Sequence, residues 1–324
     1  EGQTTADGLG VFTLSEGASF SGPHLTATAT DGDGNTSAFS IPTTGTKGWR
    51  TLQEGNTLPK TELQHRQSKE LEDNRIGGNG LVLRANIHTE SDVHRVVDED
   101  VNTGLKWKRL SLDHFDWSEV EDTGEYSRFY IDPLHDKVIT DYSGSGIKMM
   151  YLLNFWDEEI QPVERGYARF KTEEEIQRYL DYVQFIVHNF KDRIEYYELT
   201  NEPNFGEGSH FTQQNIEVVD YINVAKRAIP VIRQEYPEAK IVVGATGVYD
   251  SNWRSYLLGI LESDVMPLVD GVSWHLGRNA SPDYDEFWYE YPSFVQGIKD
   301  MTSSHGYMGE YIVEEMHWLT AGDR

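Results

Sequence analysis

The stretch Tyr-Tyr-Glu-Leu-Thr-Asn-Glu-Pro-Asn at residues 196–204 decides the fold class of this chain. It begins as a β-type run and ends abruptly in polar residues. Pro203 stops the strand, because proline has no amide hydrogen for a ladder and keeps the preceding residue out of the α region. Asn201 and Glu202 are therefore expected at the carboxyl end of a strand, where parallel sheets carry their chemistry. The plain alternative is a solvated glutamate in a strand-to-loop turn.

From residue 81 onward, short apolar runs alternate with helical patterns, which is typical of repeated βα units. Strands are expected at 81–87, 105–112, 147–155, 194–200, 241–245, 271–275 and 311–315. Helices are expected at 90–101, 129–142, from a capping box at 172–175 onward, over about twenty residues ending near 236, at 253–261 and at 292–304.

This order predicts an α/β fold, a (β/α)8 TIM-type barrel that lacks its last strand and is preceded by a short β-rich segment. The main alternative is a doubly wound open sheet. No Gly-x-Gly-x-x-Gly pattern follows an expected strand, so the dinucleotide fingerprint of that architecture is missing from the sequence.

The chain is expected to divide into three segments. Residues 1–43 form the β-rich end of a partial module, because alternating runs at 24–30 and 36–41 flank an Asp-Gly-Asp-Gly-Asn turn. Residues 44–80 are a polar connector packed on the barrel, and residues 81–324 form the barrel itself. The turn at 31–35 lacks the later acidic ligand of a calcium loop, so no metal is expected there.

The composition narrows the class of partner. The 54 acidic and 28 basic residues give a formal net charge of −26, which disfavours nucleic acid and anionic membranes because their phosphates would be repelled. There is no cysteine, and no apolar run approaches the ~18 residues of a membrane span. These features fit a secreted or cell-surface protein that acts on a neutral substrate, with further modules of the same polypeptide as potential partners.

A second acidic pair, Glu314 and Glu315, ends the seventh expected strand. In a barrel, a carboxylate there can face Glu202 across the mouth. Two carboxyl groups ~5–5.5 Å apart suit hydrolysis of a glycosidic bond with retention of configuration, and a wider gap suits inversion. Because side chains alternate along a strand, only one of Glu314 and Glu315 is expected to point inward.

Four short motifs occur in order on the second, fourth, sixth and seventh expected strands. They are Trp107-Lys108-Arg109-Leu110, Asn201-Glu202-Pro203, Val272-Ser273-Trp274-His275 and Glu314-Glu315-Met316-His317-Trp318. Over about residues 81–318 the chain resembles the clan of retaining (β/α)8-barrel glycoside hydrolases that includes cellulase-like and β-xylosidase-like enzymes. The N-terminal tail resembles the last strands of β modules in secreted bacterial surface proteins.

The resemblance implies a role for each matched residue. In that clan the nucleophile usually stands in a Thr-Glu-x-Gly-Trp motif, so alignment on Trp318 places Glu315 at the nucleophile and Glu314 at the preceding threonine. Glu202 would be the acid/base of a double displacement on a β-linked oligo- or polysaccharide, without cofactor or metal. The expected substrate-binding residues are Asn201, Arg109, His275, His88, Asn154, Trp156 and Trp318.

The sequence departs from the clan in three respects. Gly277 stands where the clan usually has an aromatic residue two positions after the histidine, and His317 replaces the glycine before Trp318. The eighth strand and its tryptophan are absent from the pattern. The alternative is a catalytically inactive carbohydrate-binding or structural surface protein on a degenerate barrel.

Overall fold

The computed structural model describes residues 75–80, 87–111, 129–155, 169–204, 216–247, 252–278 and 287–318. The expected β-rich segment 1–43 and nearly all of the connector 44–80 lie outside these ranges, as does most of the strand expected at 81–87. No helix in the described part of the chain has the length and apolar character needed to cross a membrane.

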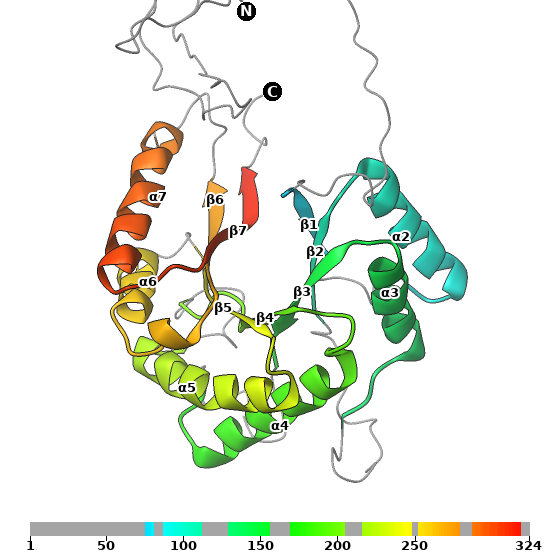
Figure 1. Ribbon diagram of the computed structural model, residues 1–324, viewed down its shortest axis with the longest axis horizontal. Helices are drawn as coiled ribbons and strands as arrows, with labels where there is room; N and C mark the ends of the chain where they lie inside the picture. Colours follow the sequence, from blue (N-terminus) through cyan, green and yellow to red (C-terminus); the bar gives the residue numbers. More distant parts are fainter. Residues whose placement is uncertain are drawn as a thin grey trace, which may run out of the picture. The chain divides into compact units, whose positions relative to one another are not determined.

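Seven described strands form one parallel sheet whose spatial order is their order along the chain. The strands are β1 (Gly77–Asn79), β2 (Trp107–Leu110), β3 (Lys148–Leu153), β4 (Tyr196–Leu199), β5 (Lys240–Thr246), β6 (Gly271–Arg278) and β7 (Glu310–Trp318). The sheet curls into a nearly closed barrel with the helices outside it (Figure 1). The predicted α/β barrel is confirmed, and the doubly wound open sheet is excluded because every neighbour pair follows chain order.

The helices lie where the periodicity predicts them, with small shifts at their ends. They are α2 (Glu90–Thr103), α3 (Pro133–Gly144), α4 (Glu173–Phe190), α5 (Val218–Glu235), α6 (Trp253–Leu261) and α7 (Phe287–Ser304), with a 3-10 turn η5 (Met266–Leu268) before β6. Thr172 and Glu175 form the predicted capping box of α4. Helix α3 begins at Pro133 rather than at residue 129, because proline is favoured in the first helical turn.

The first described strand lies before residue 81. β1 is Gly77–Asn79, inside the segment expected to be connector, and it pairs with β2. A Gly-Gly-Asn sequence carries no apolar alternation, so the pattern could not reveal it. Its glycine has a steric reason: a Cβ on Gly77 would lie 2.7 Å from the Cβ of Trp107. The Asn79 side-chain amide donates to the Glu314 carbonyl of β7 at 3.0 Å, so this hydrogen bond links the first described strand to the last.

The barrel interior is apolar at its base and polar above it. The base contains Met150, Tyr196 and Val242, packed with Trp107 and Ile312. The rings of Trp107 and Tyr196 meet edge to face with centroids 5.1 Å apart. A much larger apolar cluster fills the space between the sheet and the helices. The buried polar residues of the next layer therefore lie against apolar side chains. The low local dielectric there strengthens their mutual electrostatic interactions.

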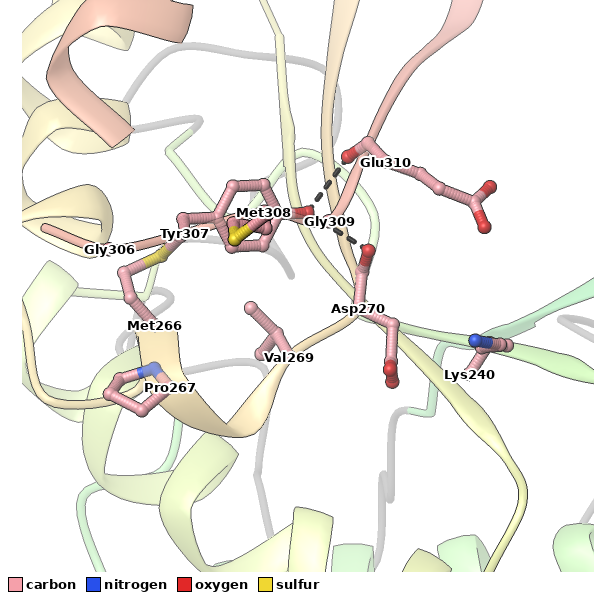
Figure 2. A pocket seen from close by; sticks show the side chains of 10 residues that line it. All are labelled: Lys240, Met266, Pro267, Val269, Asp270, Gly306, Tyr307, Met308, Gly309 and Glu310. Carbon is pink, nitrogen blue, oxygen red and sulfur yellow. Dashed lines mark hydrogen bonds between the residues drawn. The ribbon is translucent and has the colours of Figure 1, made fainter. Parts of the chain in front are cut away.

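A shallow pocket lies near the amino ends of β5, β6 and β7 (Figure 2). The Tyr307 hydroxyl lies at hydrogen-bond distance from two backbone carbonyls, 3.0 Å from that of Asp270 and 2.8 Å from that of Glu310. The Asp270 carboxylate is bound by Arg233 and by the amide of Ile241. These hydrogen bonds join the starts of neighbouring strands. We therefore interpret this group of residues as stabilising the barrel.

Candidate active site

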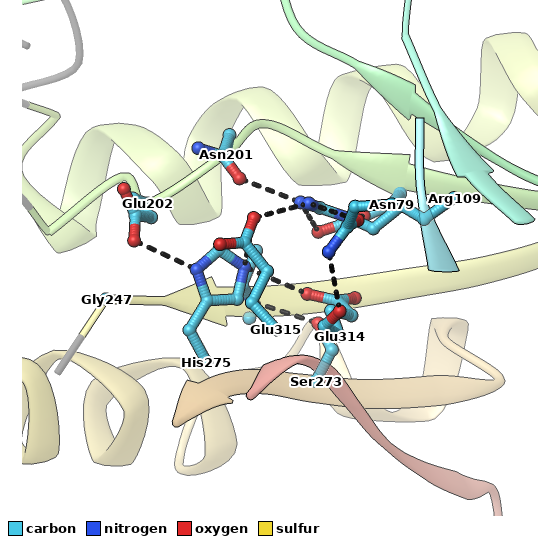
Figure 3. A network of polar contacts seen from close by, with 12 residues as sticks. Asn79, Arg109, Asn201, Glu202, Gly247, Ser273, His275, Glu314 and Glu315 are labelled. Carbon is cyan, nitrogen blue, oxygen red and sulfur yellow. Dashed lines mark hydrogen bonds and ion pairs between the residues drawn. The ribbon is translucent and has the colours of Figure 1, made fainter. Parts of the chain in front are cut away.

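The carboxyl ends of four strands bring the principal candidate residues together. Arg109 lies on β2, Glu202 follows β4, His275 lies on β6 and Glu315 lies on β7 (Figure 3). Arg109 and His275 are buried, whereas the Glu202 and Glu315 side chains retain 13% and 22% exposure. The two carboxylates are therefore accessible to solvent, while the cations that contact them are not.

Glu202 is held in an uncommon backbone conformation. Its φ is 42°, and Thr200 and Ala245 nearby have φ values of 56° and 44°, a left-handed region that costs energy for residues with a Cβ. The Glu202 amide donates to the Ala245 carbonyl at 3.0 Å. The Ala245 amide in turn donates to Ser273 Oγ at 2.9 Å. A register shift between β5 and β6 at this point turns the Ala245 carbonyl toward Glu202.

Gly244 is required by this shift. Its φ is +123°, and a Cβ there would lie 2.1 Å from the Ser273 carbonyl oxygen. We expect Gly244→Ala to lower the free energy of unfolding by about 3 kcal/mol, because it adds a backbone clash to a strained conformation. Chemical denaturation monitored by tryptophan fluorescence measures this change.

Gly297→Ala is the matched control for that substitution. Gly297 lies within α7, and a Cβ there meets nothing within 4 Å. This change should leave stability unchanged or raise it by up to about 1 kcal/mol, since alanine favours helix. Equal destabilisation by the two changes would contradict the steric role of Gly244.

Asn204 is a positioning residue that the sequence did not reveal. It is 1% exposed, and its amide donates to the Gly247 carbonyl at 2.8 Å while its Oδ1 accepts from the Gly247 amide at 2.7 Å. The Asn252 side chain donates to the Asn204 carbonyl. These bonds tie the segment after β4 to the end of β5, so they fix the height of Glu202 at the barrel mouth.

Arg109 binds four side chains at once, including Asn79, whose Oδ1 accepts from Nη1 at 3.4 Å. It makes a bidentate pair with Glu198, with Nε 2.6 Å from Oε2 and Nη2 3.0 Å from Oε1. Its Nη1 donates to Glu315 Oε1 at 2.9 Å, and its Nη2 donates to Asn201 Oδ1 at 2.8 Å. The planar guanidinium thus fixes Glu315 and Asn201 relative to each other. The sequence analysis did not identify Glu198 as a site residue. The signal that could have identified it is a charged residue within an otherwise apolar strand.

The prediction that only one of Glu314 and Glu315 points inward is wrong. In the β6–β7 pairing, Trp274 lies opposite Val313 but His275 lies opposite Glu315, so Glu314 is an extra residue in β7. This bulge interrupts the alternation of side chains. Both carboxylates consequently face His275, and the Glu314 side chain is fully buried. A bulge of this kind leaves no mark on the hydrophobic pattern.

His275 lies between the carboxylate of Glu202, which follows β4, and the two carboxylates of β7. Its Nδ1 is 2.9 Å from Glu202 Oε1, and its Nε2 is 3.4 Å from Glu314 Oε2 and 3.8 Å from Glu315 Oε1. Burial by itself lowers the pKa of His275, but the hydrogen bonds to Glu202 and Glu314 outweigh it and raise the pKa to about 9. At neutral pH the ring is therefore an imidazolium whose Nδ1–H donates to Glu202 and whose Nε2 lies at ion-pair distance from Glu314.

Glu198 and Glu314 form a fully buried carboxyl pair beneath this histidine. Burial raises the pKa of Glu198, and the charge of Glu314 raises it further against the opposing effect of Arg109. For Glu314, burial also favours the neutral form, but His275 and Arg109 outweigh it and lower the pKa. Because like charges so close together rarely both ionise, the pair holds one proton, and Glu314 is the member that keeps its charge.

Glu202 and Glu315 lie close enough to act on one bond. A carboxylate oxygen of Glu202 and one of Glu315 lie within 4.8 Å of each other, with His275 between them. At this distance both carboxylates can reach the same bond of a bound molecule.

Two sets of side chains have the composition of a metal site. They are Glu198, His275 and Glu314, and Glu202, His275 and Glu315. A dication in the first set would face the Arg109 guanidinium, which already occupies both oxygens of Glu198. In the second set, Arg109 donates to Glu315. Because the Arg109 cation already binds a carboxylate in each set, these side chains are better suited to sharing protons than to binding a metal ion.

Four predicted binding residues remain. His88 is exposed, and its amide donates to Asp92 at the start of α2; no described contact joins its side chain to the cluster. Asn154 follows β3, and its buried Oδ1 has no hydrogen-bond partner among the described residues. Trp318 is the last residue of β7. Trp156 lies outside the described residues.

The fold is shared with known glycoside hydrolases. A family 39 glycoside hydrolase from Bacteroides cellulosilyticus WH2 matches with a TM-score of 0.51 and 18% identity over 72% of this chain and 48% of that one. A monomeric β-xylosidase from Caulobacter crescentus CB15 matches with a TM-score of 0.52 and 16% identity over 76% of this chain and 52% of that one.

A hyperthermostable endo-1,4-β-D-mannanase from Thermotoga petrophila RKU-1 gives a TM-score of 0.54 and 16% identity over 77% of this chain and 80% of that one. The chain thus spans about half the length of the first two proteins. No protein-family model and no curated protein matches the sequence. At these identities the likeness establishes the barrel fold.

Proposed function

We propose that this chain is a retaining glycoside hydrolase that cleaves a β-linked oligo- or polysaccharide. The observation that carries the proposal is the pair Glu202 and Glu315, whose oxygens lie within 4.8 Å of each other at the ends of β4 and β7. Each contacts a buried cation: His275 for Glu202 and Arg109 for Glu315. The enzymes of similar fold support the β-linked class, since their names describe β-xylosidase and β-mannanase activity.

The reaction proceeds in two displacements. Glu202 protonates the leaving oxygen while the Glu315 carboxylate attacks the anomeric carbon, which breaks the glycosidic bond and forms a glycosyl-enzyme. Glu202 then removes a proton from water, whose oxygen attacks the same carbon and releases Glu315. The sugar leaves with its original anomeric configuration because each displacement inverts it once.

Arg109 and Asn201 prepare this reaction. Arg109 donates to Glu315 at 2.9 Å, which orients the carboxylate for attack. It also donates to Asn201 Oδ1, so the amide nitrogen of Asn201 remains to donate to a sugar hydroxyl next to the reacting carbon. Hydrogen bonds of this kind strengthen in the transition state.

Glu202→Gln is the direct test. We expect kcat on β-linked oligosaccharides to fall about 10²–10⁴-fold, because the amide cannot protonate the leaving oxygen. Activated aryl β-glycosides, whose leaving groups need no proton, should still form a glycosyl-enzyme that accumulates as an initial burst. Product release by chromatography and intact-protein mass spectrometry measure the two effects.

Glu262→Gln, at an exposed glutamate that follows α6, is the matched control and should behave as wild type. Wild-type protein that binds oligosaccharides but hydrolyses none would instead support the carbohydrate-binding alternative. Full activity of Glu202→Gln on unactivated substrates would remove Glu202 from the reaction.

A further inference from the structure

Glu314 is a buried ionisable residue that the two-carboxylate reaction does not use. Its side chain is fully buried on the β7 bulge, behind the Glu202–Glu315 pair. Arg109 already pairs with Glu198 and Glu315. The nearest cation to the Glu314 carboxylate is His275, whose Nε2 is 3.4 Å from Oε2. An additional buried carboxylate costs stability unless a cation compensates it, so this placement calls for a function.

The charged groups around His275 come from three strands. Glu202, following β4, contacts Nδ1, while Glu314 and Glu315 of β7 lie on the Nε2 side. Glu198 of β4 belongs to the same buried set, and Arg109 of β2 is the opposing positive charge. If residue 314 were neutral, Nε2 would have only Glu315 at 3.8 Å, and Glu315 is already bound by Arg109.

We propose that Glu314 is a positioning residue: its buried carboxylate holds His275 as an imidazolium whose Nδ1–H is aimed at Glu202. This inference rests on the proposed function, in which Glu202 is the acid/base. By supplying the negative charge on the Nε2 side, Glu314 leaves Glu315 to Arg109 and to the anomeric carbon. The bulge that turns two consecutive glutamates inward is therefore what provides separate carboxylates for the histidine and for the substrate.

The test is a proton titration of His275 in the Glu314→Gln variant. In wild type the ring should stay an imidazolium through neutral pH, seen in the ¹⁵N shifts of histidine-labelled protein and assigned by loss of the signal in His275→Asn. Glu314→Gln should lower the titration midpoint by about one pH unit or more, since an opposite charge at this distance is removed. Gln keeps the volume and removes a buried charge, so the variant should fold.

Two further variants make the result specific. Glu314→Asp keeps the charge and should retain most of the high midpoint. Glu310→Gln also lies on β7, but its carboxylate binds the Tyr196 hydroxyl at the opposite end of the strand. That variant should leave the His275 titration unchanged.

Activity gives an independent readout. The alkaline limb of kcat/KM should move to lower pH in Glu314→Gln by the same amount as the His275 midpoint, with activity near pH 6 kept. An unchanged midpoint in Glu314→Gln would overturn the proposal. A shifted midpoint in a protein without glycosidase activity would uphold the link between Glu314 and His275 and reject the proposed function instead.

Discussion

Glu315→Ala should lower hydrolysis of β-linked substrates about 10⁴–10⁶-fold, the scale expected for loss of a catalytic nucleophile. Without the carboxylate no glycosyl-enzyme can form, although Glu202 can still donate its proton. The fold should persist, because Arg109 keeps its bidentate pair with Glu198. Initial rates on activated aryl β-glycosides, which the loss of proton donation affects least, measure the effect of the nucleophile itself.

Added azide provides a sharper signature for the role of Glu315. In Glu315→Ala the anion can occupy the space left by the carboxylate and attack the anomeric carbon directly, giving the α-glycosyl azide by a single inversion. In Glu202→Ala azide instead attacks the glycosyl-enzyme from the opposite face and gives the β-glycosyl azide. NMR of the product anomer distinguishes the two outcomes. The same anomer from both variants would contradict the assigned roles.

The choice between Glu314 and Glu315 as nucleophile can be decided covalently. A panel of 2-deoxy-2-fluoro β-glycosides with good leaving groups should trap the glycosyl-enzyme, and peptide mass mapping should place the label on Glu315. The geometry favours this residue because Arg109 binds Glu315 and the side chain is 22% exposed, whereas Glu314 is fully buried. A label on Glu314 would overturn the assignment.

Arg109→Met should lower the free energy of unfolding by about 3–5 kcal/mol at neutral pH, because it leaves buried carboxylates without their cation. Glu198 loses both of its bonds to the guanidinium, and Glu315 loses its orienting donor. We expect kcat/KM to fall as well. Urea denaturation and steady-state kinetics measure the two losses.

The stability deficit of Arg109→Met should depend on pH. Burial already raises the pKa of Glu198, and Arg109 opposes that rise. Without Arg109 the folded-state pKa is higher still. A group with a raised folded pKa contributes stability that is fully present below its unfolded pKa and is lost as pH rises through the folded pKa. The wild-type folded pKa of Glu198 is about 8, so wild type and variant should lose stability in parallel below that pH. The deficit should therefore stay level between about pH 5 and 7 and grow as the pH rises above about 8; a deficit that does not grow there would contradict this account.

Two variants separate charge from packing in that result. Arg109→Met combined with Glu198→Leu removes both partners and should recover much of the stability but little activity, because Glu315 still lacks its cation. Arg193→Met removes an arginine that pairs with Asp136 and Asp192 near the surface, and it should cost about 1 kcal/mol. Equal losses in the free energy of unfolding from Arg109→Met and Arg193→Met would show that the buried network contributes no more stability than a surface ion pair.

The sequence by itself determined the barrel and the positions of its main site residues. Alternating apolar runs predict the parallel strands, and Pro203 places Glu202 just beyond β4. Local signals suffice here because strand and helix periods, caps and proline act within a few residues. Arg109, His275 and Glu315 could be named from short motifs at strand ends, and they lie together in the structure.

Only the tertiary structure decided how these residues are connected. The β7 bulge turns both Glu314 and Glu315 inward, Glu198 pairs with Arg109 from a strand two positions away, and Asn204 ties the β4 segment to Gly247. The physical reason is register. A bulge, a buried ion pair or the three-residue strand β1 exists only where two strands meet, and neither strand alone encodes the residue it will face.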